Sequence, residues 1–133
     1  MEPKNKQEFV KSRVSLAKEK LRAARKLLAD GFYRDSISRA YYAMYHLAKA
    51  ILVLRNKEPY SHKGVKILLA SELVKTGLME KQIFNMFVLA KEKREDADYR
   101  ELIKITKQDA EKSVSDAEVF IKEGTKLINR KLK

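Results

Sequence analysis

Residues that could carry out chemistry gather in the segment SISRAYYAMYHLAKAIL, which spans residues 36–52. Arg39 and His46 lie seven residues apart in it, with Tyr42 between them. On an α-helix, residues seven apart share one face and lie about 10 Å apart along the axis. An arginine can bind phosphate bidentately, and a histidine titrates near neutral pH and can accept a proton from a ribose 2′-hydroxyl. The pair therefore predicts phosphate chemistry, with metal-independent RNA cleavage as the candidate reaction.

RNA cleavage needs a base for the nucleophile and an acid for the leaving group, and His46 alone cannot be both at once. A symmetric homodimer with two Arg39–His46 rows facing each other would supply both groups. Two structural interpretations remain open. His46 could be satisfied by a neighbouring carbonyl or carboxylate, and Arg39 could pair with Asp35, four residues earlier.

The opposite face of the same helix is apolar. Ile37, Met44 and Ile51 form one seven-residue row, rotated by about 160° from the row of Arg39 and His46. We expect this apolar row to pack in the core, while Arg39, Tyr42 and His46 face another helix, a second subunit or a ligand.

Apolar residues elsewhere recur at three- and four-residue steps, which indicates amphipathic helices. The expected helices cover residues 6–29, 33–56, 62–75, 80–97 and 106–129. Gly31 and Gly77 are expected to end two of them, and Ser61 and Thr106 to cap two others. The sequence therefore predicts an all-α, up-down four-helix bundle with an additional short helix. It forms one domain over residues 1–133, with a core of about residues 7–128.

Composition narrows the function classes. The net charge is +12, and residues 1–60 hold fourteen basic and six acidic residues. Such an excess favours an anionic partner, RNA or a nucleotide, although a solubilising lysine-rich surface is an equal alternative. The expected RNA-backbone stripe runs along the first helix and consists of Lys11, Lys18, Arg22 and Arg25.

Several classes of site and location are not expected. The chain has no cysteine and two histidines, which do not make a metal-ligand set, and no motif for a cofactor is visible. We expect no membrane span, because no apolar run reaches about 18 residues. The first residues, MEPKNKQEF, lack the apolar region of a secretory signal, and a cytoplasmic location is expected.

Three segments in this order resemble the HEPN domain (higher eukaryotes and prokaryotes nucleotide-binding). They are SRAYYAMYHLAKAIL, SHKGV at residues 61–65 and KREDADY at residues 93–99. The resemblance covers about residues 7–128 and is greatest for the small, stand-alone prokaryotic members. It implies a helical bundle, often a homodimer, and metal-independent ribonuclease activity in many members. It also implies a possible partner, a minimal nucleotidyltransferase in a toxin–antitoxin pair.

The resemblance also implies residue roles. Arg39, six residues and His46 match the motif of the family's nucleases, with Arg39 holding the phosphate and His46 acting as base or acid. Those nucleases usually have a polar residue directly after the arginine, where this chain has Ala40; Asp35 or Ser36, one turn earlier, could take its place. A non-catalytic module that binds a nucleotide or a partner is therefore the alternative function.

The segment KREDADY allows two interpretations. Arg94 and Asp98 are spaced for an i,i+4 ion pair, with Tyr99 as a packing residue. Alternatively, Asp98 or Tyr99 orients Arg39 or His46, which requires their helix to pack beside that of His46. His62, next to the Ser61 cap, is expected to be a polar residue at a helix start or a contact for phosphate.

Overall fold

The computed structural model describes residues 2–130 and has the all-α architecture that the sequence predicts. Its elements are α1 (Pro3–Ala29), α2 (Tyr33–Leu54), α3 (His62–Leu69), the π-helical turn η1 (Ala70–Val74), α4 (Lys81–Tyr99) and α5 (Lys107–Asn129). The predicted domain also includes residue 1 and residues 131–133, which lie outside the described part. No helix within residues 2–130 has an apolar stretch long enough to cross a bilayer.

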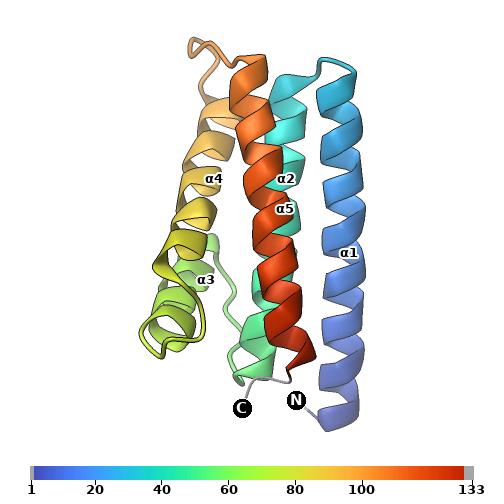
Figure 1. The fold of residues 1–133 in the computed structure, drawn as a ribbon, viewed down its shortest axis with the longest axis vertical. Coiled ribbons are helices and arrows are strands. Elements are labelled where there is room, and N and C mark those ends of the chain that lie inside the picture. Colours follow the sequence, from blue (N-terminus) through green and yellow to red (C-terminus); the bar gives the residue numbers. More distant parts are fainter. Residues whose placement is uncertain (1, 131–133) are drawn as a thin grey trace.

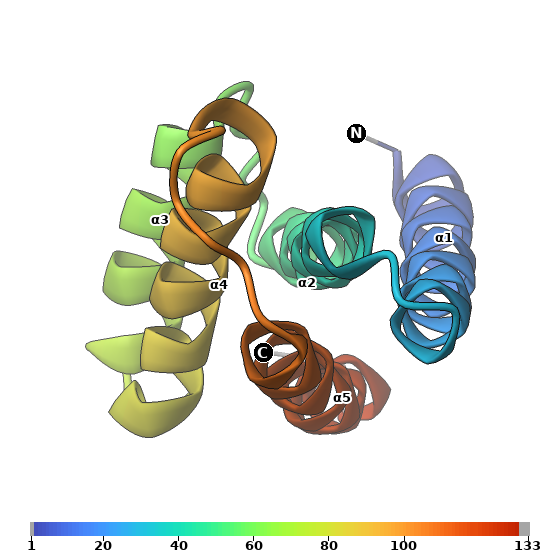
Figure 2. The same cartoon turned by 90° about the horizontal axis from the view of Figure 1, so that it is seen from above.

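The four long helices run up, down, up and down, with α1, α2, α4 and α5 as successive passes (Figure 1). The short α3 lies beside the first half of α4, at the end of the bundle where α4 begins (Figure 1). Seen along the bundle, α2 lies in the middle, with α1 on one side, α3 and α4 on the other, and α5 along a third (Figure 2).

The central position of α2 explains its composition. Thirteen of its 22 residues are buried, because α1, α4 and α5 all pack against it. The apolar row of Ile37, Met44 and Ile51 is fully buried, as predicted. Gly124 of α5 faces this side of α2 and lies against Leu47 and Ile51. The absence of a side chain at residue 124 lets α5 approach α2 closely.

The expected caps and end glycines are confirmed, while some bounds shift by two or three residues: α1 begins at Pro3 rather than at residue 6, and α2 ends at Leu54 rather than at residue 56. Gly31 and Gly77 both have the left-handed backbone that favours glycine, with φ of +84° and +79°. The Ser61 hydroxyl accepts a hydrogen bond from the backbone of Gly64, and Thr106 forms a capping box with Asp109. One difference concerns the third helix, predicted as continuous to residue 75. Its α-helical bonding ends at Leu69 and continues as a π-helical turn.

Arg34, for which no role was predicted, holds the segment between α4 and α5. Its guanidinium donates to the carbonyl oxygens of Ala97, at 2.9 Å, of Arg100, at 3.3 Å, and of Ile103. The last carbonyls of a helix have no partner within the helix, so this side chain caps the C-terminal end of α4. The cap fixes that end of α4 against the first turn of α2.

Candidate functional site

One side of α2 has no long helix over it within the described chain. This side lies opposite α5 and between α1 and α4 (Figure 2). It carries polar and aromatic side chains at three- and four-residue steps: Ser38, Tyr42, Tyr45, His46 and Lys49. All but Tyr45, which is buried, are half-buried. We call these five residues the open face of α2.

His46 on the open face pairs with an arginine of the neighbouring helix. The Nη1 atom of Arg13 on α1 lies 2.7 Å from Nδ1 of His46. A guanidinium can only donate, so Nδ1 accepts, and the proton of the neutral ring lies on Nε2. The Arg13 guanidinium also lies over the ring of Phe9, 5.1 Å from its centroid. His46 is therefore held by a cation, and neither a carbonyl nor a carboxylate was needed to satisfy it.

The charges around His46 are all basic. Burial, followed by the charges of Arg13, Lys20 and Lys49, lowers the pKa of His46 to about 4. The ring is consequently neutral near pH 7. A neutral histidine can accept a proton, but its unprotonated nitrogen is occupied by Arg13 in this arrangement.

The second histidine of the chain joins the same cluster from α3. His62 stacks on Tyr45 with ring centroids 4.4 Å apart, and its Nδ1 lies 2.7 Å from the hydroxyl of Tyr41. Burial lowers the pKa of His62 and raises that of Tyr41, so both groups stay neutral and share this hydrogen bond. The prediction of a simple helix-start residue was incomplete, because His62 packs against the open face.

Arg94 of α4 closes the cluster from the other side. Its side chain is buried, at 6% exposure, and its guanidinium lies 5.1 Å from the ring centroid of Tyr41 and 5.4 Å from that of Tyr42. Aromatic faces stabilise a cation that has lost part of its hydration. The predicted ion pair with Asp98 forms at 3.5 Å, and the Tyr99 hydroxyl accepts from Arg94 at 3.3 Å.

Asp98 thus contacts the open face through Ser38, and Tyr99 reaches it only through Arg94. Asp98 also accepts a 3.4 Å hydrogen bond from Ser38, one residue before Arg39. The contacts of Asp98 and Tyr99 are with Arg94 and Ser38, rather than with Arg39 or His46. Helix α4 does pack beside α2, and Arg94 connects the end of α4 to Tyr42.

Arg39 is exposed, two helical turns from His46 on α2. The expected ion pair with Asp35 is not formed, and Arg39 has no hydrogen-bond or ion-pair partner among residues 2–130. Asp35 is exposed in the first turn of α2. The Arg39 guanidinium is therefore available to a ligand or a second protein chain.

The predicted basic stripe of α1 lies on another side of the molecule. Lys11 and Lys18 line a groove of about 490 Å³ between α1 and α5. Arg25 forms a 2.8 Å ion pair with Glu118 of α5, and Arg22 is exposed. All four residues are exposed, whereas the basic residues whose charges lower the pKa of His46 are Arg13, Lys20 and Lys49.

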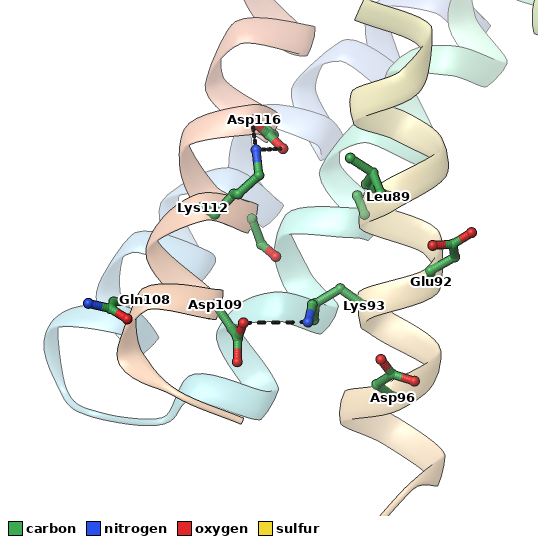
Figure 3. A pocket seen from close by; sticks show the side chains of 10 residues that line it. Leu89, Glu92, Lys93, Asp96, Gln108, Asp109, Lys112 and Asp116 are labelled. Atoms are coloured by element: carbon green, nitrogen blue, oxygen red, sulfur yellow. Dashed lines mark hydrogen bonds and ion pairs between the residues drawn. The ribbon is translucent and has the colours of Figure 1, made fainter. Parts of the chain in front are cut away.

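A pocket of about 450 Å³ between α4 and α5 does not share these features (Figure 3). Its two lysines pair with carboxylates of α5, Lys93 with Asp109 at 3.4 Å and Lys112 with Asp116 at 3.1 Å (Figure 3). Within the described part of the chain, no three His, Cys, Asp or Glu side chains are arranged to hold a metal ion. We therefore interpret this pocket as a gap in the packing of α4 against α5, and not as a functional site.

Arg13, His62 and Arg94 are the site residues that sequence reasoning missed or undervalued. One signal was present for Arg13: Phe9, Arg13 and Lys20 follow each other at steps of four and seven, as on one side of a helix. Nothing in the sequence indicated which helix that side would meet.

Comparison with known proteins is consistent with this architecture. The HEPN domain model matches residues 10–128. Two proteins of Methanocaldococcus jannaschii carry the names "Putative toxin MJ0605" and "Putative toxin MJ0142". The first is 34% identical over 86% of this chain and 84% of its own length, and the second is 31% identical over 96% and 86%. A "UPF0332 protein" of Archaeoglobus fulgidus is 30% identical over 89% of this chain and 94% of its own.

The family model spans nearly all of the described chain, including the open face of α2, α3 and the Arg94 segment. The relatives match over most of their own lengths as well. The chain belongs to the HEPN domain family.

Proposed function

We propose that this protein is a toxin-like, metal-independent ribonuclease that acts as a homodimer through Arg39 and His46. The observation that carries the proposal is the half-buried His46, bonded to Arg13 on the open face of α2, a side that no long helix covers (Figure 2). The toxin names of two relatives and the family motif support the same function. The exposed stripe of Lys11, Lys18, Arg22 and Arg25 would add contacts to the RNA backbone.

The reaction needs only proton transfers and charge stabilisation. His46 of one protomer removes the proton of a ribose 2′-hydroxyl, and the oxygen attacks the adjacent phosphorus. The bond from phosphorus to the 5′-oxygen breaks, which leaves a 2′,3′-cyclic phosphate and a 5′-hydroxyl. Arg39 balances the negative charge on the phosphate oxygens. The leaving 5′-oxygen takes a proton from His46 of the second protomer, and this requires the bound phosphate to raise the pKa of that histidine from about 4.

A second candidate function is a non-catalytic module that binds a nucleotide or a partner, such as a minimal nucleotidyltransferase. Two observations favour it. Ala40, where the family's nucleases usually have a polar residue, is fully buried, and Nδ1 of His46 is occupied by Arg13. Asp35, one turn earlier and exposed, is the acidic residue closest in sequence that could take the place of that polar group.

Cleavage of a fluorescent single-stranded RNA in the presence of EDTA distinguishes the ribonuclease from the non-catalytic module. We expect wild-type protein to give products with 2′,3′-cyclic phosphate ends. Arg39→Gln and His46→Ala should each lower the rate by at least about 100-fold, the scale of a lost proton-transfer or charge-stabilising group. Lys122→Ala, an exposed change on α5, should leave the rate unchanged.

Circular dichroism and thermal unfolding verify that each variant is folded. Cleavage that persists in folded His46→Ala would disprove the assigned role. A wild-type protein that cuts no RNA but binds a nucleotide or a nucleotidyltransferase would favour the second function.

A further inference from the structure

Three basic side chains surround His46 without an acidic partner of their own next to it. Arg13 and Lys20 come from α1, and Lys49 comes from α2, where its ammonium group lies 5.7 Å from the centroid of the Tyr45 ring. Within the described chain, none of the three forms an ion pair with a carboxylate, although the charge of Glu58 acts on Lys49. Positive charge therefore accumulates at one place without matching negative charge, which favours an anionic ligand.

Arg13 is the member of this group whose guanidinium keeps N–H donors that a ligand could use. A guanidinium has five N–H donors, and Arg13 uses one of them on the neutral ring of His46. No carboxylate binds Arg13 among the described residues, although the side chain is half-buried and fixed over Phe9. A neutral imidazole is a much weaker partner for this group than a phosphate, which can accept two parallel hydrogen bonds.

We propose that Arg13, assisted by Lys20 and Lys49, binds a phosphodiester group of single-stranded RNA and thereby releases Nδ1 of His46. The inference deepens the proposed function and rests on it for the choice of RNA as the ligand. It assigns a phosphate to α1 in addition to the one at Arg39. It makes Arg13 a positioning residue that controls when His46 can act.

The release of Nδ1 follows from the hydrogen bonds that the two ring nitrogens of His46 can make. While Arg13 donates to Nδ1, the free ring position is Nε2–H, which cannot accept a proton. When the guanidinium turns to a phosphate, Nδ1 becomes available as a base. The phosphate also adds negative charge beside a ring whose charged neighbours are Arg13, Lys20 and Lys49, with only the tyrosines Tyr42 and Tyr45 in ring contact. Its arrival should therefore raise the pKa of His46.

Binding is measured separately from cleavage with a fluorescein-labelled 2′-O-methyl oligouridine, which has no 2′-hydroxyl to react. Fluorescence anisotropy should show that Arg13→Gln binds about tenfold more weakly than wild type, and that the salt dependence falls by about 0.7 in its logarithmic slope. Arg13→Lys, which keeps the charge without the fork of donors, should fall between the two. Lys122→Gln, an exposed loss of the same charge on α5, should change affinity less than twofold.

NMR of the His46 ring supplies a second readout that a structural role for Arg13 would not move. Inorganic phosphate should raise the pKa of His46 in wild type and leave it unchanged in Arg13→Gln. Adenosine monophosphate should compete with the oligouridine only weakly, since its single phosphate lacks the neighbouring nucleotides of a chain. Competition by the mononucleotide as strong as by RNA would replace RNA with a free nucleotide and overturn the proposal.

Other outcomes separate this proposal from the proposed function. Arg13→Gln that is folded and binds the oligouridine as tightly as wild type would overturn the assignment of Arg13, and so would an equal loss in Lys122→Gln. Arg13-dependent binding by a wild-type protein that cleaves no RNA would sustain this phosphate site while the ribonuclease function fails. RNA cleavage that does not depend on Arg13 would sustain the ribonuclease function while the phosphate site at Arg13 fails.

Discussion

His46 shows how strongly one residue depends on its surroundings. In an unfolded chain, its ring would titrate near the ordinary value of 6.5, and in the folded protein it does so near 4. The difference arises from burial and from the basic residues of α1 and α2 around it. A residue with the motif position of a catalytic base is thus kept neutral and engaged by Arg13 in the absence of a ligand.

This difference predicts a pH dependence of stability. Between pH 6.5 and about 4 the unfolded chain takes up a proton at His46 that the folded protein does not, so the free energy of unfolding falls as the pH falls. Urea unfolding of wild type and His46→Gln at several pH values from 4 to 7.5 measures the effect. We expect the variant to lose less stability across this window.

Other groups do not mimic this result. His62 has a lowered pKa too and contributes in the same direction, but equally in both proteins. The lowered pKa values of Glu95 and Asp109 also reduce stability as the pH approaches 4, again equally in both proteins. If the free energy of unfolding changed with pH in the same way for wild type and His46→Gln, the result would contradict the proposed environment of His46.

At the scale of helices, the contact between α5 and α2 positions the open face. Gly124 lies where a Cβ atom would collide with Leu47 and would come within 3.1 Å of Ile51. Leu47 follows His46 directly, and both apolar residues are fully buried on the side of α2 away from the open face. The close approach of α5 therefore sets how far α2 is pushed toward α1 and α4.

Gly124→Ala tests this contact. Alanine favours a helix over glycine by about 1 kcal/mol, but overpacking a core costs about 1–3 kcal/mol, so we expect a net loss of about 1 kcal/mol, within a range of about 0–2 kcal/mol. Urea unfolding gives the value. Ser115→Ala, on the exposed side of α5, lacks the collision and should be neutral or slightly stabilising. A Gly124→Ala protein as stable as Ser115→Ala would show that the two helices can separate without cost.

At the scale of the whole molecule, the uncovered side of α2 is the surface through which we propose that two copies associate. It combines aromatic rings, both histidines and the guanidinium of Arg94, while α1, α4 and α5 cover the other sides of α2. Arg39 is exposed at its margin without a partner among residues 2–130. A two-fold arrangement about this side would place two Arg39–His46 rows across from each other.

Single-cysteine cross-linking tests the dimer, because the chain has no cysteine of its own. Ser38→Cys places a thiol on the open face, and a flexible bismaleimide should join two such chains into a covalent dimer. Ser115→Cys on the outer side of α5 should give little dimer under the same conditions. Equal yields for the two variants, or a monomer of Ser38→Cys by light scattering at micromolar concentration, would contradict a dimer through this face.

The helices and their ends were predictable because they depend on neighbours in the sequence. Apolar spacing placed the buried row of Ile37, Met44 and Ile51, and local hydrogen bonds fixed the caps at Ser61 and Thr106. The π-helical turn after Leu69 was not predicted, because its bonding differs from α-helical bonding by one residue and leaves no mark in the apolar spacing.

The sequence by itself determined the all-α bundle, its core row and the presence of Arg39, Tyr42 and His46 on the other face of one helix. Only the tertiary structure decided the neighbours of that face: Arg13 at His46, 33 residues away, and His62 at Tyr41, 21 residues away. A periodic pattern fixes which side of a helix is apolar, since it reflects contacts three and four residues apart. The partner of each polar side chain depends on how whole helices pack, which involves residues distant along the chain.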